Sequence, residues 1–310
     1  MFRRRILLAA SILILASGPL FSGQSAKGYL FIIGGGTRSE EMMQRFVFLA
    51  QRSLHKKTAI FPMASGSPEE SGQSMKDELI GLGLPDVEFY VLNHEQALQA
   101  DSASILDGVG SIYFTGGDQS RLTEALVGTT VHSRLLEIYK EGGVIGGTSA
   151  GAAVMSGIMI TGNEKRPVEE GDEAFEQILS DNIEVTPGFG FIETAIIDQH
   201  FVARKRHNRL ISLVTEHPDL LGIGIDESTA IIVHPDGSFE VIGDQNVIVY
   251  DAGGAEIEIL KSGRLSAFNI RLHILKSKDR FDLTSREPKR WNDNMLDNRT
   301  GVFFQNQGNQ

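Results

Sequence analysis

The sequence predicts an α/β protein built on a doubly wound, mostly parallel sheet. Three observations lead to this fold class. Apolar strand-like runs alternate with segments of helical periodicity, several runs close in glycines, and the composition (41% hydrophobic, 22% charged) is that of a globular protein with a sizeable core. Ligands bind outside the carboxyl ends of the strands in such sheets, so the residues that follow each strand are the first candidates for function.

The alternation can be followed in order along the chain. Residues 39–54 open with Ser39 and two glutamates and carry apolar side chains on one face, which indicates a helix. Strands are expected over 29–33, 58–62, 87–92, 111–115 and the run that ends at Gly147, with helices over 39–54, 72–81, 95–98, 120–127 and 131–141. The later runs 230–234, 238–242, 247–250 and 271–275 predict an antiparallel C-terminal extension of the sheet, with a hairpin turn at 235–237.

The two ends of the chain depart from this pattern. Residues 1–26 hold three consecutive arginines, an apolar run and a stretch of small residues, which together predict a secretory signal peptide. We therefore expect a secreted or periplasmic protein, with a retained N-terminal anchor as the alternative. Residues 27–276 are expected to form a single α/β domain, and residues 277–310 an irregular C-terminal tail.

Charge and composition narrow the function classes. The formal net charge of −11 argues against nucleic acids and anionic membranes as partners. The chain has no cysteine, which excludes disulfides, thiolate metal sites and a cysteine nucleophile. The glycine run 34–36 is not a nucleotide-binding fingerprint, because Ser39 stands where its last glycine would be, and no Walker or His-Glu-x-x-His pattern is present. We therefore expect no cofactor and no catalytic metal.

A serine in a glycine-rich turn is the first candidate for chemistry. Gly147, Ser149 and Gly151 form a Gly-x-Ser-x-Gly pattern between an apolar run and a small-residue segment that reads as a helix. In a strand–turn–helix context this pattern indicates a nucleophile elbow, with the helix start directed at a developing oxyanion. The alternative is an ordinary turn with a serine helix cap, and the pattern alone leaves the two equal.

A histidine and an acidic pair also follow apolar strands. One run ends in Asp198, Gln199 and His200, and another, residues 221–225, ends in Asp226 and Glu227. A serine at one strand end and a histidine at another have the placement that a nucleophile and its base require, and a carboxylate at a strand end could orient the imidazole. The alternatives are a structural histidine and a polar turn, and spacing does not choose between the two acids.

The segment 163–188 is rich in acidic residues and poor in strand signals. It reads as an irregular excursion over one face of the molecule. A solvated surface loop is one interpretation, and a recognition surface for cationic groups close to the serine is the other.

Four sequence blocks resemble the cyanophycinase family, a group of serine exopeptidases related to aspartyl dipeptidase (dipeptidase E). They are Thr-Gly-Gly-Asp-Gln at 115–119, Gly-Gly-Thr-Ser-Ala-Gly-Ala at 146–152, Asp-Gln-His-Phe with three arginines at 198–210, and Gly-Ile-Gly-Ile-Asp-Glu at 222–227. The resemblance covers roughly residues 28–250. It implies a fold like that of class I glutamine amidotransferases, which is flavodoxin-like, and the family also implies a homodimer.

The resemblance further implies a role for each matching residue. Ser149 would be the nucleophile, His200 the general base and Glu227 the third member of a triad. The oxyanion hole would use the backbone amides of Ala150 and of Gly117 or Asp118. The substrate pocket would be shaped by six polar residues, Gln119, Asp198, Gln199, Arg204, Arg206 and Arg209.

The substrate implied is cyanophycin (multi-L-arginyl-poly-L-aspartate), cut to β-Asp-Arg dipeptides through an acyl-enzyme. Intracellular members of the family need no signal peptide, so export favours an enzyme that uses polymer from other cells, or a relative that acts on other aspartyl or β-aspartyl peptides. A small-molecule serine esterase or amidase and a non-catalytic periplasmic protein that binds an anion are the alternatives from other classes. No nucleic acid is expected as a partner, and no membrane after signal cleavage.

Overall fold

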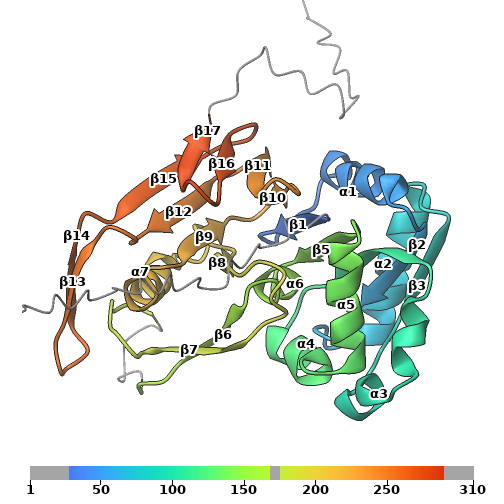
Figure 1. The fold of residues 1–310 in the computed structure, drawn as a ribbon, viewed down its shortest axis with the longest axis horizontal. Coiled ribbons are helices and arrows are strands. Elements are labelled where there is room, and N and C mark those ends of the chain that lie inside the picture. Colours follow the sequence, from blue (N-terminus) through green and yellow to red (C-terminus); the bar gives the residue numbers. More distant parts are fainter. Residues whose placement is uncertain (1–27, 168–174, 290–310) are drawn as a thin grey trace, which may run out of the picture.

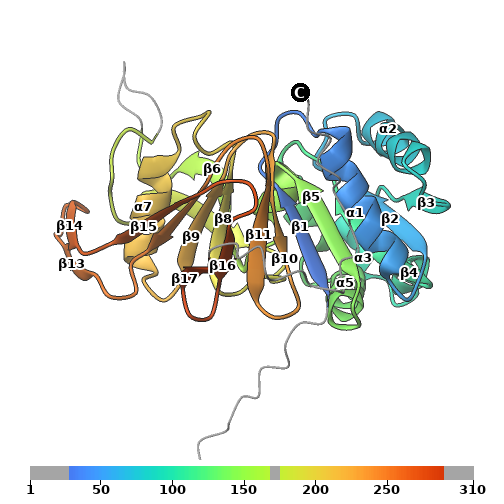
Figure 2. The ribbon, with the colours of Figure 1, turned by 90° about the horizontal axis from the view of Figure 1, so that it is seen from above.

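The computed structural model describes residues 28–167 and 175–289. The expected signal peptide therefore lies outside the described residues. Two sheets stand side by side, one of nine strands and one of four, with helices packed around them (Figures 1 and 2). The protein is thus a mixed α/β protein whose large sheet contains a parallel half, as expected from the alternation of strands and helices.

The nine-stranded sheet has a parallel half and an antiparallel half. The parallel half consists, in spatial order, of β1 (Tyr29–Ile33), β5 (Val144–Thr148), β4 (Val109–Phe114), β2 (Lys57–Phe61) and β3 (Asp86–Phe89). On the other side of β1 follow β10 (Thr229–Val233), β11 (Ser238–Gly243), β16 (Arg280–Asp282) and β17 (Glu287–Lys289), each antiparallel to its neighbour. The expected hairpin turn at 235–237 connects β10 and β11.

Helices cover both faces of this sheet because the strands alternate their side chains between two cores. Phe31 and Ile33 belong to one cluster with helices α1 and α2, whereas Leu30 and Ile32 belong to the other. The helices are α1 (Glu40–Arg52), α2 (Pro68–Gly81), α3 (His94–Leu98), α4 (Gln119–Leu126), α5 (Thr130–Lys140) and the short α6 (Ala150–Ala153), with a 3₁₀ turn η1 (Ser102–Leu106). Ser39 caps α1 by accepting the Met42 amide at 3.2 Å, as the opening of that helix predicts.

The four-stranded sheet was not foreseen. It consists of β8 (Ala195–Gln199), β9 (Leu221–Ile225), β12 (Val247–Asp251) and β15 (Arg271–Leu275), with β8 and β9 parallel and β12 antiparallel to both of its neighbours. Of the four strands expected to extend the main sheet, only β10 and β11 do so; β12 and β15 join the second sheet. Helix α7 (His207–Glu216) packs on β9, where Gly222 leaves room for Val214 and Leu210.

Two further hairpins and the end of the described chain also differ from expectation. The pair β6 (Ile158–Glu164) and β7 (Ile183–Pro187) gives strand structure to both ends of the acidic segment, and β13 (Glu256–Ile259) pairs with β14 (Leu265–Phe268) in an arm that projects from the body (Figures 1 and 2). Strands β16 and β17 occupy the start of the tail that was expected to be irregular; residues 290–310 lie outside the described part. Across 28–167 and 175–289, no helix combines the length and apolar character that crossing a membrane requires.

Candidate active site

Ser149 lies at a strained turn between β5 and α6. Its φ of 53° and ψ of −110° are rare for a residue with a side chain, which is typical of a nucleophile elbow. The flanking glycines have a steric reason. A Cβ on Gly147 would overlap the Gly151 carbonyl, and a Cβ on Gly151 would overlap the carbonyl of Phe114 on β4. The turn therefore brings α6 directly against two strand ends and leaves the serine side chain at the sheet edge.

His200 follows β8 and reaches Ser149 across the boundary between the two sheets. Its Nε2 lies 2.9 Å from the Ser149 Oγ, although 51 positions separate the two residues in sequence. The His200 backbone has a φ of 48°, and only 9% of its side chain is exposed. The serine and the histidine expected from the sequence are therefore within hydrogen-bond distance.

Glu227, after β9, accepts a hydrogen bond from the same imidazole. The distance from His200 Nδ1 to Glu227 Oε1 is 2.6 Å, so Nδ1 carries the proton and Nε2 is left to accept the serine hydroxyl proton. Asp226 points elsewhere. Its Oδ1 accepts the amides of Val202 at 3.1 Å and Ala203 at 2.9 Å. Of the two acids that spacing left open, Glu227 contacts the imidazole and Asp226 holds the loop after it.

The surroundings of His200 favour its neutral form. Burial lowers the pKa of the His200 imidazole most strongly, and the Arg204 and Arg206 cations lower that pKa further, against the hydrogen bond and charge of Glu227. A general base must be unprotonated, so the lowered pKa keeps this imidazole ready to accept a proton at neutral pH.

This direction predicts the acid side of the pH profile. We expect kcat/KM to persist below about pH 6.5, the ordinary histidine value, and to fall only as the pH drops through the lowered pKa of His200. Arg204→Gln removes one lowering charge and should move this limb to higher pH, whereas Lys261→Gln, on the β13–β14 turn, should leave it in place. Initial rates of the wild type and of the two variants across about pH 5 to 8 measure the position of the acid limb in each. A shift toward lower pH in Arg204→Gln would contradict the assignment.

Two backbone amides near the serine are available to an oxyanion. Within the described part of the chain, the amides of Ala150 and Gly117 have no hydrogen-bond acceptor. Asp118 differs from expectation, because its amide already donates to the Ala64 carbonyl at 2.8 Å. Gly117 has a φ of +139°, and a Cβ there would overlap the same Ala64 carbonyl, so this close approach requires glycine. Of the three amides expected to serve an oxyanion, those of Gly117 and Ala150 are therefore still available.

The six residues expected to shape a pocket divide into buried and exposed ones. Asp198 and Arg209, about 1–2% exposed, form a two-pronged ion pair through Arg209 Nε at 2.7 Å and Nη2. Gln119 is also turned inward, because its Nε2 donates to the carbonyls of Ile160 at 2.9 Å and Thr161 at 2.6 Å. These three side chains hold the site's framework together in this structure.

The other three residues lie closer to solvent or lack a partner. Arg206 donates to the Gln199 carbonyl at 2.6 Å, and burial together with Arg209 lowers the pKa of Arg206 to about 10. The Gln199 Oε1 is buried without a hydrogen-bond partner in the described residues, and Arg204 is exposed. Arg204 and Gln199 are therefore the members of the set with polar groups left for a ligand. Within the same described ranges, no group of three His, Asp or Glu side chains is placed to hold a metal ion.

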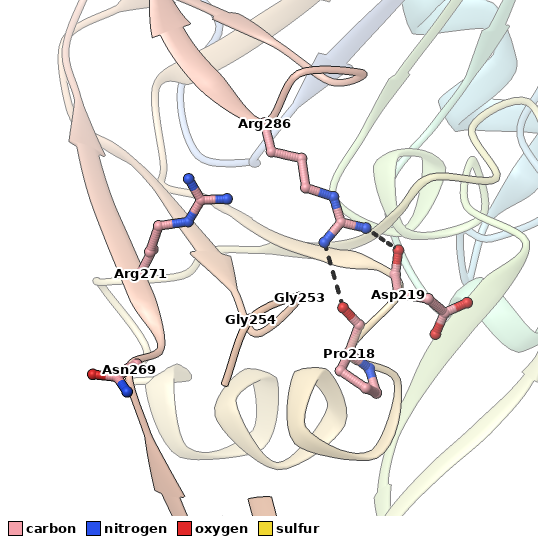
Figure 3. A pocket seen from close by; sticks show the side chains of 7 residues that line it. All are labelled: Pro218, Asp219, Gly253, Gly254, Asn269, Arg271 and Arg286. Carbon is pink, nitrogen blue, oxygen red and sulfur yellow. Dashed lines mark hydrogen bonds between the residues drawn. The ribbon is translucent and has the colours of Figure 1, made fainter. Parts of the chain in front are cut away.

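One hollow of the described surface lies at the opposite end of β9 from Glu227. Its volume is about 690 Å³, and its lining residues are Pro218, Asp219, Gly253, Gly254, Asn269, Arg271 and Arg286 (Figure 3). Both arginines are committed to protein groups. Arg286 donates to the carbonyls of Pro218 and Asp219, and it shares the fully buried Asp251 carboxylate with Arg271. Because Arg286 lies between β16 and β17, this cluster fastens the end of the main sheet to the second sheet.

Arg286→Ala should therefore destabilise the fold. The substitution leaves a buried carboxylate with one cation fewer, so we expect unfolding free energy to fall by about 1–3 kcal/mol and Tm by several degrees. Lys276→Ala, which removes only an exposed pair with Asp279 at 3.9 Å, is the control and should change stability by less than about 0.5 kcal/mol. Urea and thermal unfolding measure both; equal stabilities would show that the cluster is not a structural link.

A serine, a histidine and a glutamate joined by hydrogen bonds beside two unpartnered amides form the site of a serine hydrolase. The chain belongs to Peptidase family S51, whose model matches residues 30–241, and it is a serine-type exopeptidase.

Relatives of known name agree with this family. The chain is 33% identical over 276 residues to a cyanophycinase of Geminocystis herdmanii, which covers 86% of this chain and 97% of the relative. It is 34% identical to a cyanophycinase of Trichormus variabilis, in a match that covers 85% of this chain and 88% of the relative. The crystal structure of a peptidase from an acI-B1 Actinobacterium has the same fold, with a TM-score of 0.60 and 22% identity over 84% of this chain and 98% of that one.

Proposed function

We propose that this protein is a secreted cyanophycinase, which hydrolyses cyanophycin to β-Asp-Arg dipeptides through an acyl-enzyme on Ser149. The observation that carries the proposal is the hydrogen-bonded series Ser149 Oγ, His200 Nε2, His200 Nδ1 and Glu227 Oε1, with distances of 2.9 and 2.6 Å. The cyanophycinase names of relatives at 31–34% identity support the substrate.

The first half of the reaction forms the acyl-enzyme. The Ser149 Oγ attacks the scissile carbonyl carbon while its proton passes to His200 Nε2, and the Glu227 carboxylate stabilises the imidazolium. The amides of Gly117 and Ala150 donate to the oxyanion of the tetrahedral intermediate. When the carbon–nitrogen bond breaks, the leaving amine takes the proton from Nε2, and Ser149 carries the acyl group as an ester.

The second half returns the enzyme to its starting state. Water attacks the ester carbonyl and gives its proton to His200 Nε2, and a second oxyanion is stabilised by the same two amides. Collapse releases the carboxylic acid product, and the imidazole returns its proton to Ser149 Oγ. The reaction therefore consumes one water molecule for each amide bond that is cut.

The charges at the site suit a substrate that carries carboxylates. Arg204 is exposed, Arg206 keeps 15% of its side chain exposed, and both lie in the loop that follows His200. A guanidinium binds a carboxylate through two parallel hydrogen bonds, so this loop can orient an aspartyl backbone. The acidic residues that would meet the arginyl branches, between 168 and 174, lie outside the described residues.

Incubation with purified cyanophycin tests the proposal. The mature protein should release β-Asp-Arg as the main soluble product, identified by mass spectrometry, with no release by Ser149→Ala. A parallel incubation with β-aspartyl and α-aspartyl peptides that lack arginine separates the second candidate, a peptidase for other acidic peptides, which the exposed Arg204 also favours. Cleavage of those peptides without dipeptide release from the polymer would replace the first proposal by the second.

We also propose three finer features that accompany this function. They are export by the N-terminal signal peptide, assembly as a homodimer, and a doubly wound sheet of the class I glutamine amidotransferase type with an antiparallel C-terminal extension. The TM-score of 0.60 to a peptidase structure supports the sheet arrangement. Mass measurement of the mature protein recovered from the periplasm or medium, together with light scattering, tests the first two.

A further inference from the structure

The chain segment at the carboxyl end of β1 holds all three parts of the Ser–His–Glu arrangement. The Ser149 amide donates to the Ile33 carbonyl at 3.0 Å, and the His200 amide donates to the Gly34 carbonyl at 2.7 Å. The Ser228 amide, directly after Glu227, donates to the Gly35 carbonyl at 2.9 Å. Three consecutive carbonyls of one strand end therefore each accept a hydrogen bond from one of the three functional turns.

The three residues that donate these bonds share an unusual backbone conformation. Ser149, His200 and Ser228 have φ values of 53°, 48° and 54°, in the left-handed region that residues with side chains rarely occupy. Such conformations persist where surrounding contacts over-determine them. The bonds to 33–35 are contacts of this kind, and they place the strain at the turns that carry the reacting groups.

The glycine side of the same segment supplies a close-fitting surface. A Cβ added to Gly35 would overlap the His200 imidazole at Cε1 and Nε2, so the ring lies directly against the glycine backbone. A Cβ on Gly36 would come within 2.7 Å of the Glu227 Cβ. The imidazole thus has no room to move toward β1, and its Nε2 faces Ser149.

We propose that residues 33–36 are a positioning element for the triad, in which Gly35 sets the plane of the His200 imidazole and Gly36 sets the Glu227 side chain. The proposal rests on the proposed function of the triad. Neither glycine touches the reacting atoms of a substrate, so both are positioning residues. A side chain at either position would overlap a catalytic group, in addition to straining the backbone at a positive φ.

The alternative is that glycine is needed at these two positions only because their φ values, +106° and +68°, are positive. The chain offers matched controls for this alternative. Gly83 has a φ of +103°, and its added Cβ would meet only Gln51 Nε2 at 3.6 Å; Gly128 has a φ of +78° with nothing within 4 Å. Replacing each glycine of a pair by alanine imposes the same backbone strain, but only Gly35 and Gly36 impose a contact with the triad.

We therefore expect Gly35→Ala to lower kcat for cyanophycin about 100-fold or more, with KM changed by less than about twofold, because displacing a catalytic group by about 1 Å costs this much. The rate at which a fluorophosphonate labels Ser149 should fall in parallel. Gly83→Ala, which imposes the backbone strain without the overlap, should keep its kcat. Gly36→Ala should lower kcat about tenfold, and Gly128→Ala should not.

Equal kcat in Gly35→Ala and Gly83→Ala would overturn the positioning role. If Gly35→Ala fails to fold, the comparison of Gly36→Ala with Gly128→Ala decides it by the same criterion. A third readout does not depend on peptidase activity: the downfield proton resonance of the His200 Nδ1–Glu227 hydrogen bond, identified by its loss in His200→Ala. Its loss in Gly35→Ala but not in Gly83→Ala supports the inference even if wild-type protein cleaves no cyanophycin, an outcome that would refute only the proposed function.

Discussion

Ser149→Ala should lower kcat by on the order of 10⁵–10⁶-fold while leaving KM for the polymer close to the wild-type value. The alanine removes the oxygen that forms the acyl bond and the hydroxyl that His200 Nε2 accepts at 2.9 Å. It retains the amides of Gly117 and Ala150, so some stabilisation of an oxyanion remains and the loss is large but finite. Dipeptide release from cyanophycin, followed by mass spectrometry over long incubations, measures a residual rate this small.

A second serine variant tests whether the loss of activity is specific to the nucleophile. Ser67→Ala, in the exposed loop before α2, removes a hydroxyl that caps nothing and should keep full activity. Thermal unfolding of both variants excludes a loss of fold as the cause. If Ser149→Ala kept activity within tenfold of wild type, another group would have to attack the carbonyl, and the esterase and peptidase mechanisms would both fail.

The parallel half of the main sheet follows from local sequence, because β1, β4 and β5 are short apolar runs next to glycines and α1 and α5 have a helical period. β1 is Tyr29–Ile33 as expected, and α1 begins at Glu40, one residue after the expected start at Ser39. Which sheet a strand joins is not a local property. The runs at 247–251 and 271–275 read like those of β10 and β11, yet β12 pairs with β9, and β15 pairs with β12. On β9, Gly222 and Gly224 admit Leu210 and Phe201.

The parts of the candidate site that consist of reactive residue types directly after a strand could be predicted from the sequence. The parts that depend on the direction of a side chain could not. Ser149, His200 and Glu227 meet as their positions after β5, β8 and β9 suggest. Arg206 and Arg209 were both expected to shape the pocket, but Arg206 precedes α7, which begins at His207, and Arg209 turns inward to Asp198. The role proposed for Gly35 and Gly36 could not be predicted either, because it depends on how closely the His200 and Glu227 side chains approach them in space.

Exchanging Glu227 for glutamine should cost about 10³–10⁴-fold in kcat, because the change reverses the histidine tautomer. The glutamine amide can donate to His200 Nδ1, and Nε2 then carries the proton and can no longer accept one from Ser149 Oγ. Nothing else at the site needs to move, so KM and thermal stability should change little. The Glu227 side chain is 40% exposed, so solvent can compensate for part of the lost carboxylate charge. We therefore expect a smaller loss of kcat than in Ser149→Ala.

Asp226→Asn is the matched control, since it makes the same exchange of carboxylate for amide one residue earlier. Asp226 uses one oxygen to accept two amides, those of Val202 and Ala203, and the oxygen of asparagine can accept both. We therefore expect kcat within about tenfold of wild type, because the loop after His200 keeps its support while the tautomer is unaffected. Steady-state kinetics on cyanophycin compare the two variants directly. The reverse order of effects would mean that the imidazole takes its orientation from Asp226 during turnover, and that the 2.6 Å bond to Glu227 is not the one that supports the base.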